Sequence, residues 1–185
     1  MVSNGSVFKK GHLIDSPPFH FHKNKILKLT SPFLEKAVHE SCKIKKAVVQ
    51  KDEKEKGLRK ILNFGHSFAH AYEATLGFSK KLNHGEAVIL GMKTALNFSL
   101  KTKLMNKRDY YSIIDHIDNS DLPSSVSKFF SPKDVNKILS FMAKDKKNRS
   151  NNINLVLLKK IGVPVINKEY SKKKIGLFLK IFLRN

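Results

Sequence analysis

Two apolar patterns of helical period, joined by a short loop, constrain the fold of this chain more than any other feature. Residues 58–76 carry apolar side chains three or four positions apart, and Gly77 suits the position that follows a helix C-terminus. After the loop at 78–83, residues 84–103 carry small and apolar side chains, as in a buried helix. A short loop favours antiparallel neighbours, so we expect these two helices to pack as a pair.

The remaining patterns predict a mainly α domain with one short β element. Ser31 and Pro32 start a helix that runs to about residue 48, and the charged run that follows is expected to be a solvated turn. Further elements are predicted as helices at 106–117, 131–142 and 172–182 and a strand at 154–158. The prolines at 17 and 18 favour irregular structure there. The expected organisation is an irregular segment, 1–30, and one helical domain, 31–185.

The net charge of +21 is the strongest compositional signal, and it first suggests nucleic-acid binding. The basic residues are nearly all lysines scattered from end to end, whereas arginine is the residue expected at base and phosphate contacts. No helix-turn-helix, zinc-finger or RNA-binding motif is present. We therefore expect no specific nucleic-acid partner, although a basic chain attracts anionic substrates such as sugar phosphates.

The composition also predicts the compartment. The chain has no apolar run long enough to span a membrane, and its first ten residues lack the apolar core of a signal peptide. Its single cysteine, Cys42, excludes an internal disulfide framework and fits a reducing compartment. We expect a soluble cytoplasmic protein with no membrane partner.

Three histidines give the helical pair its chemical interest. His66 and His70 are four residues apart, so on a helix they share one face, and His84 begins the next predicted helix. An antiparallel pair would bring His84 back to the level of His66. Imidazole is a good zinc ligand, but histidines at this spacing also occur on solvated faces or as hydrogen-bonded core residues.

The neighbours of these histidines favour a binding site. Gly65 and Gly85 lie directly beside two of them, where the backbone or a ligand can approach closely. Asn63 and Arg59 lie about one and two turns before His66 if residues 58–76 form a single helix, as the pattern predicts. A face that mixes His, Asn and Arg in an otherwise apolar segment needs polar partners.

Three strings of sequence carry a specific resemblance. They are Lys-Asp-Glu-Lys-Glu-Lys-Gly-Leu-Arg at 51–59, Leu-Asn-Phe-Gly-His-Ser-Phe-Ala-His-Ala-Tyr-Glu at 62–73 and His-Gly-Glu-Ala-Val-Ile-Leu-Gly-Met at 84–92. They resemble the 3-dehydroquinate synthases, members of the sugar-phosphate cyclase group. The likeness is dense over 43–93 and weaker at 145–147 and 154–158, while 1–30 carries no family motif. The resemblance implies the helical C-terminal domain of the dehydroquinate synthase-like fold.

The resemblance also implies residue roles. The family converts 3-deoxy-arabino-heptulosonate 7-phosphate to 3-dehydroquinate and phosphate in the shikimate pathway, a carbon–oxygen lyase reaction that uses NAD and a divalent metal. His66 and His84 match metal ligands, for Zn²⁺ or Co²⁺, and His70 matches a histidine of proton transfer. Glu73 and Glu86 are expected to support the site without binding the metal. The matches to substrate-binding positions are Lys45, Arg59, Asn63 and Lys146, with Lys147 as an alternative register for the last.

Two parts of the family pattern are absent from the sequence. The third metal ligand of the family is a Glu in an Ala-Glu-Val-Ile-Lys stretch, and the first Glu here is Glu35. No Gly-rich NAD motif is present either. We therefore expect a fragment that is inactive without an NAD-binding N-terminal half. Either the gene is interrupted or mis-started, with 1–30 the product of a shifted frame, or the missing half is a separate chain.

Other functions stay open from the sequence. A different sugar-phosphate cyclase, such as one that makes an inosose or a valiolone, shares the histidine pattern. A polyol dehydrogenase has a similar two-half plan, but the dense match at 63–73 argues against it. A non-catalytic basic binding module is the alternative of another class. The resemblance implies a sugar-phosphate substrate and, as is common in the family, a homodimer.

Overall fold

The computed structural model describes residues 25–26, 28–119, 123, 125–144 and 152–184. The chain divides into two compact units, 1–62 and 63–185, and each is described by itself. Lys146, one of the predicted substrate-binding residues, lies outside the described residues.

The first unit is built on α3, Phe33–Lys51, which confirms the helix predicted after Pro32. Its half-buried and buried positions recur at helical spacing, and Lys45 lies on the exposed part of the helix. The turn that follows is organised by one side chain. The Asp52 carboxylate accepts hydrogen bonds from the backbone N–H groups of Lys56 (2.9 Å), Gly57 (2.7 Å) and Arg59 (3.0 Å). The charged run is therefore a structured turn.

The single helix predicted at 58–76 is wrong. The chain forms a short 3₁₀ helix, η1 (Leu58–Asn63), then a turn, and then the α-helix α4 (His66–Thr75). The break lies at Gly65, whose φ of 81° is in the left-handed region that an α-helix excludes. Arg59 and Asn63 are thus not on the helix that carries His66. Their predicted position on the same helix face as His66 assumed an unbroken helical repeat, which Gly65 interrupts.

The pair of helices at the centre of the second unit is confirmed. α4 packs against α5, His84–Lys101, which begins with a capping box in which the Glu86 carboxylate accepts from the Asn83 N–H at 2.8 Å. The backbones touch at two glycines. A Cβ added to Gly91 would lie 2.3 Å from the Gly65 carbonyl oxygen, and a Cβ on Gly65 would lie 2.6 Å from the Met92 nitrogen. Only glycine permits so close a crossing.

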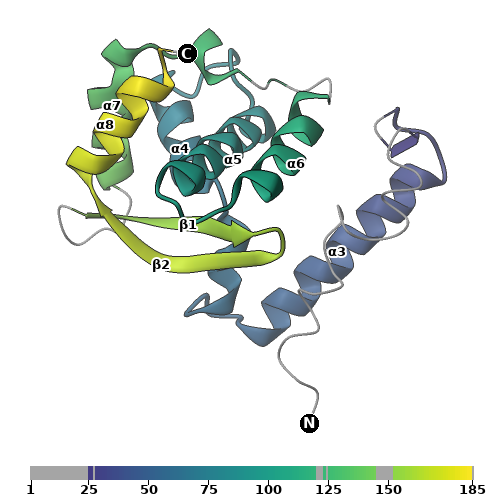
Figure 1. The fold of residues 1–185 in the computed structure, drawn as a ribbon. Helices are drawn as coiled ribbons and strands as arrows, with labels where there is room; N and C mark the ends of the chain where they lie inside the picture. Colours follow the sequence, from purple (N-terminus) through teal and green to yellow (C-terminus); the bar gives the residue numbers. More distant parts are fainter. Residues whose placement is uncertain (1–24, 27, 120–122, 124, 145–151, 185) are drawn as a thin grey trace. The chain divides into compact units, whose positions relative to one another are not determined.

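The other helices of the second unit lie around this pair (Figure 1). α6 packs on α5, and its buried isoleucines at 113, 114 and 117 meet Leu96 and Met105. α7 packs on α4 and on α8. Their bounds are α6 Lys107–Asp118, η2 Val126–Lys128, η3 Pro132–Asp134, α7 Val135–Lys144 and α8 Lys172–Phe182. The predicted mainly helical fold class is confirmed.

A β-hairpin lies across one face of the α4–α6 layer (Figure 1). β1, Asn152–Lys160, confirms and extends the predicted strand, while β2, Val163–Ser171, was not predicted. The strands pair antiparallel, from Asn152 opposite Ser171 to Lys160 opposite Val163. β1 buries alternate side chains against α5 and α7, as a strand with one covered face does. Among the described helices, none is long and apolar enough to cross a membrane.

Candidate metal and substrate site

The three predicted site histidines come together in the second unit. His66 opens α4, His70 follows one turn later, and His84 opens α5. The ring centroids are 5.6 Å apart for His66 and His70, 5.9 Å for His66 and His84, and 6.2 Å for His70 and His84. His84 lies beside His66, as the antiparallel helix pair predicted, and so its ring joins the other two.

Two of the rings are oriented through one nitrogen. The Nδ1 of His66 lies 3.3 Å from the backbone oxygen of Phe64. The Nδ1 of His84 lies 3.1 Å and 3.2 Å from the two carboxylate oxygens of Glu73, whose side chain is only 14% exposed. An Nδ1 that donates its proton to such an oxygen leaves the lone pair on Nε2. In its neutral form, each predicted metal ligand would then carry its lone pair on Nε2.

The electrostatics of His66 favour the same form. Partial burial lowers the pKa of His66, and the neighbouring His70 and His84 lower it further, against the opposing effect of the Phe64 carbonyl. The neutral imidazole, which is the form that binds a metal ion, is thus favoured at neutral pH.

The donor set suits a zinc-type ion but is not complete. With zinc–nitrogen bonds of about 2.1 Å, the centroids of two imidazoles on one tetrahedral ion are about 5 Å apart. The observed separations are wider by about 1 Å or less. Within the described ranges, no group of three or more His, Cys, Asp or Glu side chains is arranged to hold a metal. The histidines thus fit as part of a ligand set that needs a further donor.

Glu73 and Glu86, which were expected to support the site, make different contacts. Glu73 follows His70 by three residues on α4 and contacts His84, whereas Glu86 caps the N-terminus of α5. The sequence predicted that a carboxylate would support the histidines, but it did not indicate which histidine Glu73 would contact.

The predicted substrate-binding residues are not all in the histidine unit. Asn63, at the end of η1, belongs to the second unit and is half-buried. Lys45 and Arg59 belong to the first unit. There the Arg59 guanidinium donates to the backbone oxygen of Glu53 at 2.6 Å, which fixes the arginine to the turn that Asp52 organises.

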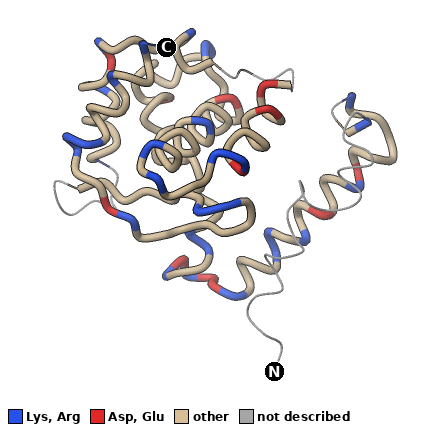
Figure 2. The backbone as a smooth tube through the Cα atoms, viewed as in Figure 1, with Lys and Arg blue, Asp and Glu red and all other residues tan. Residues whose placement is uncertain are grey.

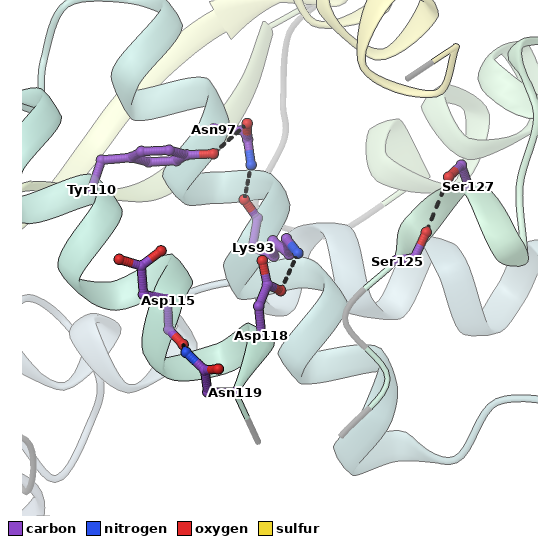
Figure 3. Close-up of polar contacts among 8 residues, drawn as sticks. All are labelled: Lys93, Asn97, Tyr110, Asp115, Asp118, Asn119, Ser125 and Ser127. Atoms are coloured by element: carbon purple, nitrogen blue, oxygen red, sulfur yellow. Dashed lines mark hydrogen bonds and ion pairs between the residues drawn. The ribbon is translucent and has the colours of Figure 1, made fainter. Parts of the chain in front are cut away.

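Polar bonds between helices hold α5 in place behind the histidines. The Tyr72 hydroxyl of α4 is 2.8 Å from the Thr94 hydroxyl in a buried pair, and burial raises the pKa of Tyr72. On the other side, Tyr110 of α6 donates to the Asn97 side chain at 2.9 Å and Lys93 pairs with Asp118 (Figure 3). These contacts connect α5 to both neighbours, so the position of His84 depends on the whole helix layer.

Comparison with known proteins identifies the family. The family model described as 3-dehydroquinate synthase C-terminal matches residues 4–148. The chain belongs to this family. The match begins at residue 4, so it includes most of the segment 1–30, in which no family motif was recognised from the sequence.

Sequence relatives agree with this membership. The 3-dehydroquinate synthase of Pelagibacter ubique (strain HTCC1062) is 55% identical over 175 residues, which are 92% of this chain and 48% of the relative. The 3-dehydroquinate synthase of Bradyrhizobium diazoefficiens is 36% identical over 151 residues, 79% of this chain and 40% of the relative. The chain spans about half the length of the curated relatives it matches.

Solved structures share the fold. One is 2-deoxy-scyllo-inosose synthase complexed with carbaglucose-6-phosphate, NAD⁺ and Co²⁺, with a TM-score of 0.68 and 23% identity over 82% of this chain and 42% of that one. Another is a 2-epi-5-epi-valiolone synthase from Streptomyces hygroscopicus with NAD⁺ and Zn²⁺ bound, with a TM-score of 0.72 and 18% identity over 99% of this chain and 48% of that one. At these identities the likeness concerns the fold alone.

Proposed function

We propose that this chain is the metal-binding C-terminal half of a 3-dehydroquinate synthase, which converts 3-deoxy-arabino-heptulosonate 7-phosphate to 3-dehydroquinate and phosphate in the shikimate pathway. The observation that carries the proposal is the His66–His84 pair, in which an oxygen acceptor holds each Nδ1 and each Nε2 is left for a metal. The 55% identity to a 3-dehydroquinate synthase supports this substrate over those of other cyclases.

The two histidines would supply Nε2 ligands to Zn²⁺ or Co²⁺. A divalent ion bound there supplies Lewis-acid stabilisation of negative charge on substrate oxygens. Glu73 holds the His84 ring in the tautomer that keeps Nε2 unprotonated, and the Phe64 carbonyl does the same for His66. The further ligand and the NAD site would belong to an N-terminal half outside these 185 residues, so we expect these residues alone to be inactive.

His70 is proposed to transfer protons. Its exposed ring lies beside both proposed ligands, at 5.6 Å and 6.2 Å between centroids, where a substrate oxygen on the ion would be within reach. Histidine is the side chain that most often transfers protons as a general acid or base in enzymes. The proposed contacts to the anionic and hydroxyl groups of the sugar phosphate come from Lys45, Arg59, Asn63 and Lys146.

The assembled enzyme is proposed to be cytoplasmic and to work as a homodimer of joined halves. Its partners are then the NAD-binding half and the sugar phosphate, with no specific nucleic acid or membrane. Another sugar-phosphate cyclase is the second candidate, because the inosose and valiolone synthases share the fold. Phosphate release by the joined halves would separate these activities, if 3-deoxy-arabino-heptulosonate 7-phosphate is compared with the substrate of an inosose synthase and with that of a valiolone synthase.

Zinc binding to the isolated chain tests the proposed site. Titration calorimetry should detect one zinc site that His66→Ala or His84→Ala removes, because each variant deletes one of two proposed ligands. His39→Ala, which removes an exposed histidine of α3, is the matched control and should bind zinc like the parent. If both ligand variants bind zinc like the parent, the metal assignment is wrong. A basic binding module would instead show salt-sensitive nucleic-acid affinity that survives His66→Ala.

A further inference from the structure

A second candidate site lies at the far end of α5. It is an open groove of about 930 Å³, formed by the C-terminal end of α5 and the loop after it, the end of β1 and the exposed side of α8. The helix has 18 residues, so its ends are about 27 Å apart at 1.5 Å per residue. The groove is therefore separate from the histidines at the N-terminal end of α5.

The rim of the groove is basic. Five lysines line it, and they are Lys101, Lys103, Lys107, Lys159 and Lys160. All five are exposed. Among the described residues, no acidic side chain lines the groove, and none forms an ion pair with any of the five lysines. Lysines recur along α5–α8 and both strands (Figure 2), but here they border a hollow. Without acidic partners, their charge is available to an anion.

The floor of the groove is apolar. Leu104 and Phe182 are half-buried, while Ile181 keeps 53% of its surface exposed although α8 has a buried side available for apolar residues. The ring of Phe178 stacks on Phe182 with centroids 5.4 Å apart and meets Phe98 edge-on at 5.0 Å. Because Phe178 is buried between these rings, it adds apolar contact to the floor but offers no open ring face for a nucleic-acid base.

The charge and the surface together select the ligand. A nucleic acid or inorganic phosphate would pair with the lysines but leave the apolar floor exposed to water. A neutral lipid would cover the floor but leave the lysines without a counter-charge. The volume lies in the range of small-molecule sites. We propose that this groove binds a small amphiphilic anion, an apolar chain or ring joined to a carboxylate or phosphate, taken up as a free molecule.

The test uses the 185-residue chain and three matched probes, followed by titration calorimetry below micellar concentrations. Dodecanoate has both an apolar body and a negative charge. Dodecyltrimethylammonium keeps the chain but reverses the charge, and acetate keeps the charge without the chain. We expect one saturable site for dodecanoate and none for the other two probes.

Variants place the site. Lys101→Glu with Lys160→Glu should raise the dissociation constant for dodecanoate at least about tenfold, which corresponds to about 1.4 kcal/mol. Lys80→Glu with Lys81→Glu is the matched control, because these exposed lysines lie in the loop at the other end of α5 and the charge change is the same. The control should bind within about twofold of the parent, since charges so far away are largely screened.

A charge-neutral variant tests the floor. Ile181→Ser leaves the lysines in place and should weaken dodecanoate binding about fivefold through lost apolar contact. Equal binding of both twelve-carbon probes, or equal affinity of the groove and control variants, would overturn the proposal. So would binding to phosphatidylglycerol vesicles without binding of free dodecanoate, which would indicate a lipid surface. Zinc binding at the histidines is unaffected by any of these outcomes, so the two proposals fail separately.

Discussion

The two ends of α5 hold their charged and polar groups in different ways. At the N-terminal end, the rings of His66 and His84 are each oriented by one oxygen acceptor, and the backbones behind them are in contact at Gly65 and Gly91. At the C-terminal end, exposed lysines border an apolar hollow without ion pairs to other described residues. Fixed orientation suits a metal with demanding geometry, whereas mobile charge around an apolar surface suits a less specific ligand.

The largest effect should come from the glycine contact that supports the N-terminal end. Gly91→Ala places a Cβ 2.3 Å from the Gly65 carbonyl oxygen, and backbone atoms cannot move aside without separating α4 from α5. We expect a loss of about 3 kcal/mol in the free energy of unfolding, measured by urea denaturation.

The control for that variant lies in the same helix. Gly85→Ala adds a Cβ that meets nothing within 4 Å, so it should leave stability unchanged or raise it by up to about 1 kcal/mol. Equal stability of the two variants would show that the close crossing of α4 and α5 does not support the histidine cluster.

The next largest effect concerns the orientation of His84. Glu73→Gln keeps the size of the side chain but removes the carboxylate charge that holds the Nδ1 proton. Zinc affinity of the chain should fall about 10-fold to 100-fold, as measured by calorimetry. Glu169→Gln, at an exposed position of β2, is the matched control and should leave zinc affinity unchanged. A Glu73→Gln chain that binds zinc like the parent would contradict the role of this carboxylate.

A smaller effect is expected at the bond that connects α4 to α5. Tyr72→Phe removes a buried hydroxyl, but Thr94 keeps its second bond, to the Leu90 carbonyl oxygen at 2.8 Å. Because no buried group loses its last partner, the cost should be about 1 kcal/mol in thermal or urea denaturation. The half-buried bond from Tyr110 to Asn97 offers a comparison, and Tyr110→Phe should cost less. The opposite order would mean that α6 positions α5 more firmly than α4 does.

The smallest effect is local to the first unit and depends on pH. Hydrogen bonds from the backbone of Arg59 and Gly57 lower the pKa of Asp52. A carboxyl whose pKa is lower in the folded state stabilises that state above its unfolded pKa, and the contribution is lost as the pH falls through the folded value. Hydrogen exchange at the Gly57 amide should therefore show protection at neutral pH that decreases in acid. Unchanged protection in acid, or in Asp52→Asn, would show that another contact holds the turn.

Sequence periodicity predicted the elements that lie within one uninterrupted pattern. The predicted helices at 84–103, 106–117 and 172–182 correspond to α5, α6 and α8. The break at Gly65 was missed because the apolar period continues across it, and only the contact with Gly91 and Met92 requires the turn. β2 was missed because its Pro164 and its charged second half obscure the alternation, which pairing with β1 supplies.

The histidine group was predicted because its spacing is local on α4 and needs only one short loop to add His84. The contact between Glu73 and His84 depends on how the two helices cross, so sequence indicated only the type of residue. The basic groove gave no sequence signal of its own, because its lysines come from α5, the following loop and β1 and are surrounded in sequence by many others.

The most direct test of the central claim is reconstitution with an NAD-binding half. The part of the Pelagibacter ubique relative that this chain does not cover would be co-expressed with the chain, and phosphate release from 3-deoxy-arabino-heptulosonate 7-phosphate would be measured with NAD and Zn²⁺. The proposal predicts release that requires both halves and is abolished by His84→Ala but not by His39→Ala. A stable complex of the two halves that binds zinc and releases no phosphate, beside an active full-length relative, would contradict it.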